Sequence, residues 1–404
     1  MKNQTAYDAI KASVVALNEA IGPLYQTCYL YGSLAQGLYQ PDQSDINLLI
    51  IVDDRTDMHE VRAALKPIWV EYGDVLRRAP GIATQSAFQR HMLLNPILAR
   101  HIDRFGKQVK GSKKALYQTS PLDKTRYLAR MAARSLVASQ ALAPQLMPDE
   151  SQRLVPLTEL RRLIRQIRRG PVGQDETAVS LFHELQTFLH QQMTQLGIAL
   201  PEQNNTGSAP YDVPGLRAIY ERMGNLVLVV DKLPHLTQTD FDWEKLAAQV
   251  PPEYIGLQLV TPAQLQLAVE YEFALEYSLQ NFRHIWGERL IEKLEPPVWA
   301  VLRDAARFVS DIQIYDLPHA YITAVSPDGD DEQVLRKIIH DFQNKLLNAR
   351  LQNELLSRLK FVDRYEPPTP LPDRTAPSQE RLAGILNQLN EWSEFYKEGM
   401  LSAV

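Results

Sequence analysis

The chain has 404 residues, of which 45% are hydrophobic, and a formal net charge of −5. This length is typical of two or three globular domains, and the acidic balance excludes a protein that coats nucleic acid over its whole surface. No apolar run approaches the roughly 18 residues of a membrane span, and the N-terminus has no signal-peptide core, so we expect a soluble, cytoplasmic protein without a membrane partner. The single cysteine, Cys28, lies in an apolar run and is expected to be a small buried residue.

The first pattern that suggests a chemical function consists of two short segments. An apolar run ends in a Gly-Ser turn at Gly32 and Ser33, and a second apolar run follows Asp45 and Asn47. Side chains alternate across a strand, so residues two positions apart share a face. Two carboxylates so placed would hold the divalent ions that bridge a nucleoside triphosphate, but Asn47 offers a neutral amide in place of the second carboxylate.

These segments resemble the active-site motif of the nucleotidyltransferase superfamily, in particular the small bacterial branch of kanamycin-type and minimal nucleotidyltransferases. The resemblance implies a mixed sheet, a helix before the Gly-Ser turn, and a triphosphate held by the turn amides, the Ser33 hydroxyl and Gln36, since such amides form an anion-binding nest. It also implies Mg²⁺ at Asp45 with Asn47 as a neutral ligand, and transfer of a nucleoside monophosphate onto a small-molecule or protein hydroxyl. The residues that carry the resemblance are Gly32, Ser33, Ala35, Gly37, Ser44, Asp45, Leu48 and Leu49.

Three departures from the family pattern predict a degraded metal site. Gln36 stands where many relatives have Arg or Lys, and Asn47 stands where they have Asp or Glu. The third acid, which the family places on a later strand, should fall near residues 96–101, yet that segment reads Pro-Ile-Leu-Ala-Arg-His. We therefore expect a nucleotide-binding or scaffolding pseudo-enzyme. An active nucleotidyltransferase that uses Mg²⁺ and a nucleoside triphosphate is the alternative.

A near copy of the second apolar run predicts an internal duplication. Residues 47–53 read Asn-Leu-Leu-Ile-Ile-Val-Asp, and residues 225–231 read Asn-Leu-Val-Leu-Val-Val-Asp. Thr84 lies 37 positions after the first of these asparagines, and Thr261 lies 36 positions after the second. The spacing after the two runs therefore agrees within one residue. We expect an α+β fold, in which a nucleotidyltransferase-like mixed β-sheet domain and a helical bundle are followed in tandem by a second, degenerate copy.

The second copy has Met223 and Asn225 where the first has its acid and amide. Farther along, apolar and polar residues alternate over residues 269–279, which predicts a half-buried strand, although the Glu, Ala and Leu content also suits a helix. On such a strand Glu276 would occupy the region of the family's third acid and serve as a metal ligand, including in a composite site with Asp45. The simpler interpretation is a solvated strand face.

The remaining segments have helical apolar spacing and complete the domain organisation. Residues 157–167 and 181–193 are expected to form a bundle with a helix that starts at residues 120–123, and residues 298–314 and 332–361 are expected to be helices of the second copy. The predicted divisions are a nucleotidyltransferase-like domain (1–118), a helical bundle (119–202), a linker (203–215), a second unit (216–295), a helical region (296–366), a Pro-rich linker (367–378) and a C-terminal amphipathic helix (379–404).

Two surfaces suggest partners. The C-terminal helix carries an apolar stripe that docks either on its own chain or on a partner protein. A run of arginines lines one side of a predicted helix, where their mutual repulsion favours anionic neighbours. We expect these guanidinium groups to be solvated or paired within the chain, with phosphate or RNA contact as the alternative. The residues are Arg161, Arg162, Arg165, Arg168 and Arg169.

Overall fold

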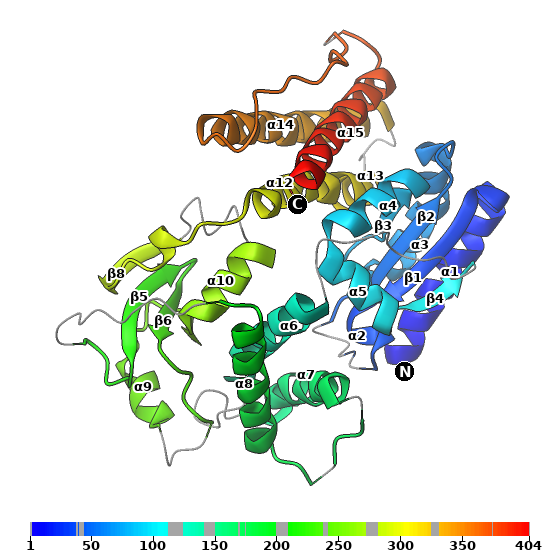
Figure 1. Cartoon of the computed structure of the whole chain (residues 1–404). Helices are drawn as coiled ribbons and strands as arrows, with labels where there is room; N and C mark the ends of the chain where they lie inside the picture. The colour runs from blue at the N-terminus through cyan, green and yellow to red at the C-terminus, as the bar shows by residue number, and fades with distance from the viewer. Residues whose placement is uncertain are drawn as a thin grey trace. The chain divides into compact units, whose positions relative to one another are not determined.

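The computed structural model divides the chain into two compact units (Figure 1). The first unit contains residues 1–121 and 301–404, and the second contains residues 122–300. The structure describes residues 2–37, 39, 44–111, 124–140, 150–168, 170–173, 175–198, 209–236, 241–271, 282–324, 331–373 and 375–403. None of the helices in these ranges is long and apolar enough to span a membrane.

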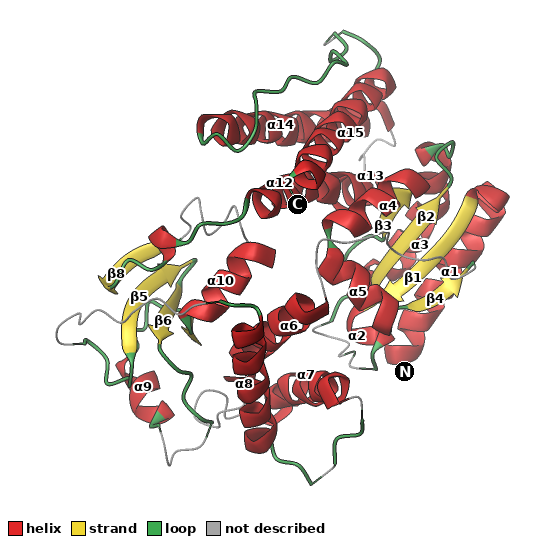
Figure 2. Cartoon of the chain, in the orientation of Figure 1, coloured by secondary structure: helices red, strands yellow, loops and turns green. Residues whose placement is uncertain are grey.

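The first unit is built on a mixed four-stranded sheet with the order β3-β2-β1-β4. Strand β1 runs antiparallel to β2 and β4, whereas β2 and β3 are parallel (Figure 2). Every residue of β2 after Asn47 is buried, because helices cover both faces of the sheet. The strands are β1 (Tyr25–Tyr31), β2 (Asn47–Val52), β3 (Gly81–Thr84) and β4 (Lys107–Lys110).

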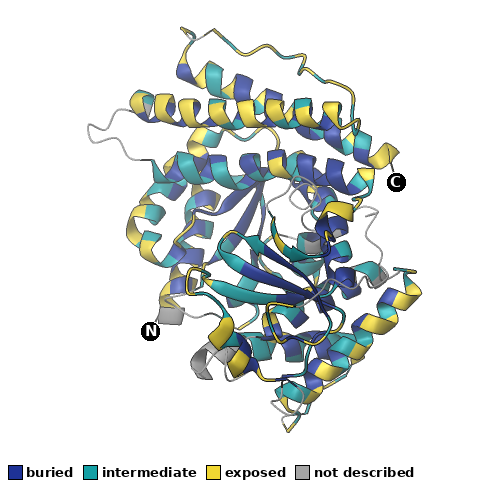
Figure 3. Ribbon diagram, turned by 90° about the vertical axis from the view of Figure 1, so that its left-hand side faces the viewer, coloured by how far each residue is buried: buried dark blue, intermediate teal, exposed yellow. Residues whose placement is uncertain are grey.

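Helices from both ends of the first unit's sequence cover this sheet. One face packs on α1 and α3, and the other packs on α4, α5 and the π-helical turn η4 (Ile312–Asp316). Buried residues concentrate in the strands and on one side of the helices (Figure 3). The N-terminal helices are α1 (Lys2–Ile21), α2 (Gly32–Ala35), α3 (Met58–Leu76), α4 (Gln85–Leu94) and α5 (Pro96–Phe105), with the 3-10 turn η1 (Gly22–Leu24).

The residues after 300 belong to the first unit, although the sequence pattern attached them to the second copy, and two of their elements, η4 and α13 (Leu317–Thr323), pack on the first sheet. The Arg62 Nε atom donates to the backbone oxygen of Tyr321 at 2.8 Å, and the Ala79 amide donates to His319 Nδ1 at 3.2 Å. These elements are α12 (Val298–Asp311), η4 (Ile312–Asp316), α13 (Leu317–Thr323), α14 (Asp331–Arg358) and α15 (Ser378–Ser402).

The C-terminal helix α15 docks on its own chain. Trp392, Tyr396 and Met400 on its apolar stripe are at most 1% exposed. The ring of Phe395 stacks on Tyr365 with centroids 4.2 Å apart. The extended segment before the helix is held as well, since Gln388 Nε2 donates to the Thr369 oxygen at 2.7 Å. In this structure the apolar stripe is therefore covered without a partner protein.

The second unit combines a helical bundle with another mixed sheet. The predicted bundle is confirmed, since helices α6, α7 and α8 contribute buried apolar residues to one shared core. The sheet has the order β7-β6-β5-β8, with β5 antiparallel to β6 and β8 and with β6 parallel to β7. The elements are α6 (Lys124–Ser139), α7 (Glu150–Arg168), α8 (Ala178–Gln195), β5 (Leu216–Arg222), β6 (Asn225–Val230), α9 (Trp243–Gln249), β7 (Gly256–Val260), α10 (Pro262–Tyr271), β8 (Arg283–Gly287) and η3 (Ile291–Lys293).

The two sheets agree in a detail beyond strand order. The first strand of each carries a register shift near its start, in β1 and in β5. A glycine with positive φ follows β4 and another ends β8, namely Gly111 (φ +89) and Gly287 (φ +84). A Cβ atom on Gly111 would overlap the Gln26 oxygen, and one on Gly287 would overlap the Arg217 oxygen. Each shifted strand therefore needs a glycine opposite it.

Replacing Gly287 by alanine is expected to destabilise the second unit by about 2–3 kcal/mol, because the new Cβ forces both a disfavoured φ and a backbone shift. The matched control is Gly197→Ala in the same unit, where φ is +64 but no atom lies within 4 Å of the new Cβ. That variant should lose only about 1 kcal/mol. Urea unfolding followed by circular dichroism measures both losses, and equal losses would contradict the close contact.

Three sequence predictions need correction or fall outside the described residues. Residues 269–271 end helix α10, so the predicted strand is wrong there, and the rest of that segment, including Glu276, lies outside the described residues. Residues 96–101 lie on helix α5, not on a strand that could carry a third acid. The helix start expected at residues 120–123 also lies outside the described residues.

The arginine run on α7 is paired within the chain where the structure describes it. Arg168 forms ion pairs with the carboxylates of Glu176 and Glu184. Arg161 Nη2 donates to the backbone oxygen of Glu176 at 3.1 Å. Arg169 lies outside the described residues. The interpretation of an intramolecularly paired face therefore holds for Arg161 and Arg168.

Candidate functional site

The Gly-Ser turn lies at the carboxyl end of β1, where the chain enters the short helix α2. Gly32 has a φ of +77, in the left-handed region that favours glycine. A Cβ atom on Gly32 would collide with the side-chain amide of Asn47. Asn47 pairs with Tyr31 across the first two strands, so its side chain reaches the turn from the neighbouring strand. The structure thus brings together two of the predicted site residues, Gly32 and Asn47.

Asp45, the predicted metal ligand, lies in the loop directly before β2 and is exposed. Within the described ranges, no group of three or more His, Cys, Asp or Glu side chains could hold a metal ion. Strands β3 and β4 supply no carboxylate beside it, since they read Gly-Ile-Ala-Thr and Lys-Gln-Val-Lys. Hard cations such as Mg²⁺ require oxygen ligands, usually with one or two carboxylates. The described part of this site offers one carboxylate and one neutral amide.

Gln36 ends the turn and contacts a residue that the motif did not predict. Its Nε2 atom lies 3.0 Å from Nε2 of His101 on α5. Its Oε1 atom is buried and has no hydrogen-bond partner among the described residues. His101 falls in the segment in which the family pattern places its third acid, and that position was the only sequence signal that could have drawn attention to it. A histidine therefore stands beside the turn where a carboxylate was sought.

An aromatic side chain from the distant C-terminal part of the first unit closes one side of this edge. The Tyr31 hydroxyl donates to the Tyr315 hydroxyl at 3.4 Å, and the Tyr315 ring occupies the space that a side chain at Gly81 would need. The Arg78 guanidinium lies 5.2 Å from the centre of the Tyr315 ring. Burial raises the pKa of both tyrosines, so both hydroxyls stay protonated and neutral. No sequence pattern pointed to Tyr315.

The single cysteine does not take part in this chemistry. Cys28 is 1% exposed on β1, and burial raises the pKa of its thiol to about 12. A thiol with this pKa is protonated at neutral pH and is a poor nucleophile. The expected role as a buried apolar residue is confirmed.

The second sheet has no counterpart of the Gly-Ser turn at the equivalent edge. Strands β5 and β6 are joined directly by Met223 and Gly224, with φ values of +48 and +79. Two successive residues with positive φ form the tight turn that suits a two-residue hairpin. Asn225 then begins β6, and its side-chain amide donates to the Arg222 oxygen at 3.4 Å. The described connection between β5 and β6 is therefore too short to cradle a phosphate.

The chemistry available at the Gly-Ser turn is that of neutral donors and acceptors. Gln36, Asn47 and His101 supply hydrogen bonds, and Asp45 supplies the only carboxylate among the predicted ligands that the structure describes. Such a set can bind a polar group, but its single carboxylate provides less negative charge than the paired acids of the family's metal site. Comparison with family models and with curated proteins found no match to this chain.

Proposed function

We propose that this chain is a nucleotidyltransferase-like protein made of two copies of one α/β unit, and that it acts by binding and scaffolding, not by catalysis. The duplication is supported by the shared strand order, the shared strand directions and the glycine that faces the shifted first strand in each sheet. It is also supported by the similar runs that form β2 and β6. In this proposal the protein is cytoplasmic.

We infer the loss of catalysis from the neutral side chains around Gly32, which stand where the resemblance expects charged groups. Asn47 lies against the turn where the resemblance expects a carboxylate, and Gln36 faces His101 where it expects a cation. Phosphoryl transfer depends on positioned metal ions and fixed charges, and the loss of one such group commonly costs several kcal/mol. At about 1.4 kcal/mol per factor of ten, the remaining rate would lie orders of magnitude below that of an intact site.

Nucleotide binding at the turn remains part of the proposal. The turn amides and the Ser33 hydroxyl would contact a triphosphate, with Gln36 and Asn47 as neutral neighbours. Without a second carboxylate, Mg²⁺ adds little to this binding. A protein partner would have to use a surface other than the apolar stripe of α15, which the chain itself covers. The composite site of Asp45 with Glu276 would revive the enzyme alternative.

Replacing Asn47 by aspartate is expected to create Mg²⁺-dependent ATP binding, because it restores a second carboxylate without changing the size of the side chain. The gain should be about tenfold in affinity, since a contact to a charged group is worth about 1.5 kcal/mol more than a neutral one. Calorimetric titration with ATP, with and without Mg²⁺, measures it. The matched control is Asn225→Asp, at the same place on β6 but beside a closed hairpin, and it should bind no better than the wild type.

Two further measurements decide between the proposal and its alternative. The double variant Asn47→Asp with Asp45→Asn should lose the gained Mg²⁺ dependence. The wild type, incubated with radiolabelled ATP and Mg²⁺, should transfer no nucleotide to itself or to a panel of hydroxyl acceptors. Mg²⁺-dependent ATP binding by the wild type that disappears in Asp45→Ala would overturn the proposal and establish a working metal site.

A further inference from the structure

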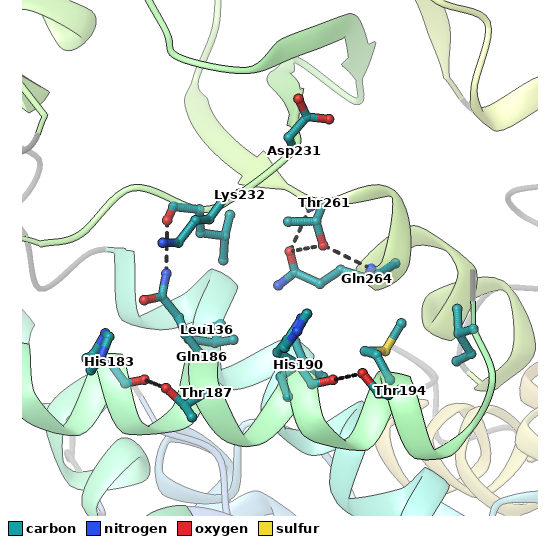
Figure 4. A pocket seen from close by; sticks show the side chains of 15 residues that line it. Leu136, His183, Gln186, Thr187, His190, Thr194, Asp231, Lys232, Thr261 and Gln264 are labelled. Atoms are coloured by element: carbon teal, nitrogen blue, oxygen red, sulfur yellow. Dashed lines mark hydrogen bonds between the residues drawn. The ribbon is translucent and has the colours of Figure 1, made fainter. Parts of the chain in front are cut away.

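A cavity of about 470 Å³ opens within the second unit, between helix α8 and the ends of strands β6 and β7 (Figure 4). Strands β6 and β7 are parallel, and the residues that follow them, Asp231, Lys232 and Thr261, line the cavity. This is the edge opposite the Met223–Gly224 hairpin. Ligands of open α/β sheets commonly bind outside the carboxyl ends of parallel strands. The volume also lies within the roughly 300–1,000 Å³ range of small-molecule sites.

The cavity has apolar walls and a polar rim. Much of its lining comes from apolar side chains, which favour a ligand with an apolar body. Helix α8 adds a row of polar residues at helical spacing. In Figure 4 the side chains of His183, Gln186 and His190 point toward the strand ends, whereas the hydroxyls of the two threonines in the row donate to backbone oxygens of the helix at 3.1 Å. The apolar residues are Leu136, Leu189, Met193, Ile198, Leu233 and Ala263. The row on α8 is His183, Gln186, Thr187, His190 and Thr194.

The rim carries one acid and one base next to each other in the sequence. Asp231 lies 3.6 Å from the buried guanidinium of Arg217, which also pairs with Glu288 at 2.9 Å. Lys232 is exposed at the rim, and no carboxylate of the described residues lies within ion-pair distance of its ammonium group. An anionic group on a ligand would therefore find a cation at Lys232, with the imidazoles of His183 and His190 on the facing helix.

One buried acceptor in the wall lacks a partner. Gln186 Nε2 donates to the Leu233 oxygen at 3.0 Å, which fixes the side chain, but its Oε1 atom is buried without a hydrogen bond from the described residues. Gln264, by contrast, uses both ends of its amide, since it accepts from the Thr261 amide at 2.8 Å and donates to the Ala133 oxygen at 3.2 Å. A buried acceptor without a donor is unfavourable. A ligand with an N–H or O–H group would satisfy it.

We propose that this cavity binds a small organic anion with an apolar body, placing its anionic group at Lys232 and a hydrogen-bond donor at Gln186. The site lies in the second unit and does not depend on the Gly-Ser turn of the first. 1-Anilinonaphthalene-8-sulfonate is a suitable probe, because it combines an aromatic body, a sulfonate and one N–H donor. Its neutral analogue, N-phenyl-1-naphthylamine, has the same body and donor without the charge.

Fluorescence titration of the full chain with the sulfonate is expected to show one saturable site. Lys232→Gln should weaken binding of the sulfonate about threefold to fivefold, as expected for an ion pair at an exposed rim, and should leave binding of the neutral analogue unchanged. Thr187→Phe, which places a large ring in the cavity from an exposed helix position, should abolish binding of both probes. Lys337→Gln, which changes an exposed lysine of α14 in the first unit, is the matched control and should alter neither.

Thermal melting followed by circular dichroism checks that each variant folds. Decanoate, an aliphatic anion, should displace the sulfonate from the wild type. Sulfonate binding that survives both Lys232→Gln and Thr187→Phe would place the probe elsewhere and overturn the proposal. The absence of a saturable site in the wild type would overturn it as well.

Discussion

Replacing Trp392 by alanine is expected to lower the free energy of unfolding of the first unit by about 3–5 kcal/mol. Trp392 is 1% exposed and packs edge-to-face on Tyr365, with ring centroids 5.1 Å apart. It also stacks on Tyr396 at 5.8 Å. Removing the indole leaves a cavity beneath α15 in addition to the lost burial of apolar surface. Urea unfolding followed by circular dichroism measures the loss.

The control for this prediction lies on the same helix. Leu401 is 49% exposed, so Leu401→Ala should change the free energy of unfolding by less than about 0.5 kcal/mol. Hydrogen exchange should show that Trp392→Ala exposes the amides of α15 before those of the sheet strands. An unfolding curve for Trp392→Ala that matches the wild type would mean that the apolar stripe of α15 is not docked on its own chain in solution, and would return a partner protein to consideration.

The second large effect is expected from Arg217→Met, which should destabilise the second unit by about 3–5 kcal/mol. Arg217 and Glu288 side chains are 2% and 5% exposed. Two parallel hydrogen bonds join them, from Arg217 Nε at 3.0 Å and from Nη2 at 2.9 Å. The loss is large because removing the guanidinium leaves the Glu288 carboxylate buried without its cation. Urea unfolding followed by circular dichroism measures it.

Two comparisons separate the two causes of this instability, which are the buried Glu288 carboxylate without its Arg217 cation and the loss of packing. The double variant Arg217→Met with Glu288→Leu should recover part of the lost stability, because an apolar pair of similar size often replaces a buried ion pair at little cost. Arg283→Met removes a more exposed partner, since Arg283 is 71% exposed in its ion pair with Glu221, and should cost no more than about 1 kcal/mol. A double variant less stable than Arg217→Met alone would contradict this account of the buried pair.

Several elements of the fold follow from the local pattern. The runs at β2 and β6 could be predicted as strands, since a strand covered on both faces reads as a continuous Leu, Ile and Val segment. The bundle helices and the C-terminal helix followed from apolar residues at helical spacing, because one side of each must be buried. The alternation at residues 269–271 predicted a strand where the chain forms a helix. A few apolar residues fit both the strand period and the helix period, and Val269 is buried as part of helix α10.

The sequence predicted only those parts of the candidate site that belong to one local motif. Gly32 and Asn47 were expected together from the motif, and the structure brings them into contact. His101 and Tyr315 were not predicted, because they reach Gln36 and Tyr31 from α5 and η4 through packing of segments far apart in the sequence. The cavity beside α8 could not be seen either, since its walls come from separate helices and strand ends.

The sequence by itself determined the two apolar strands β2 and β6, the bundle and C-terminal helices, and which groups carry charge. The neutral character of Gln36 and Asn47 holds whatever surrounds them. Only the tertiary structure decided that η4 and α13 cover the first sheet, that α15 docks on its own chain, and that Lys232 and Gln186 line one cavity. Local periodicity tells which side of an element is apolar, but the neighbour that covers it is chosen by close packing between distant segments.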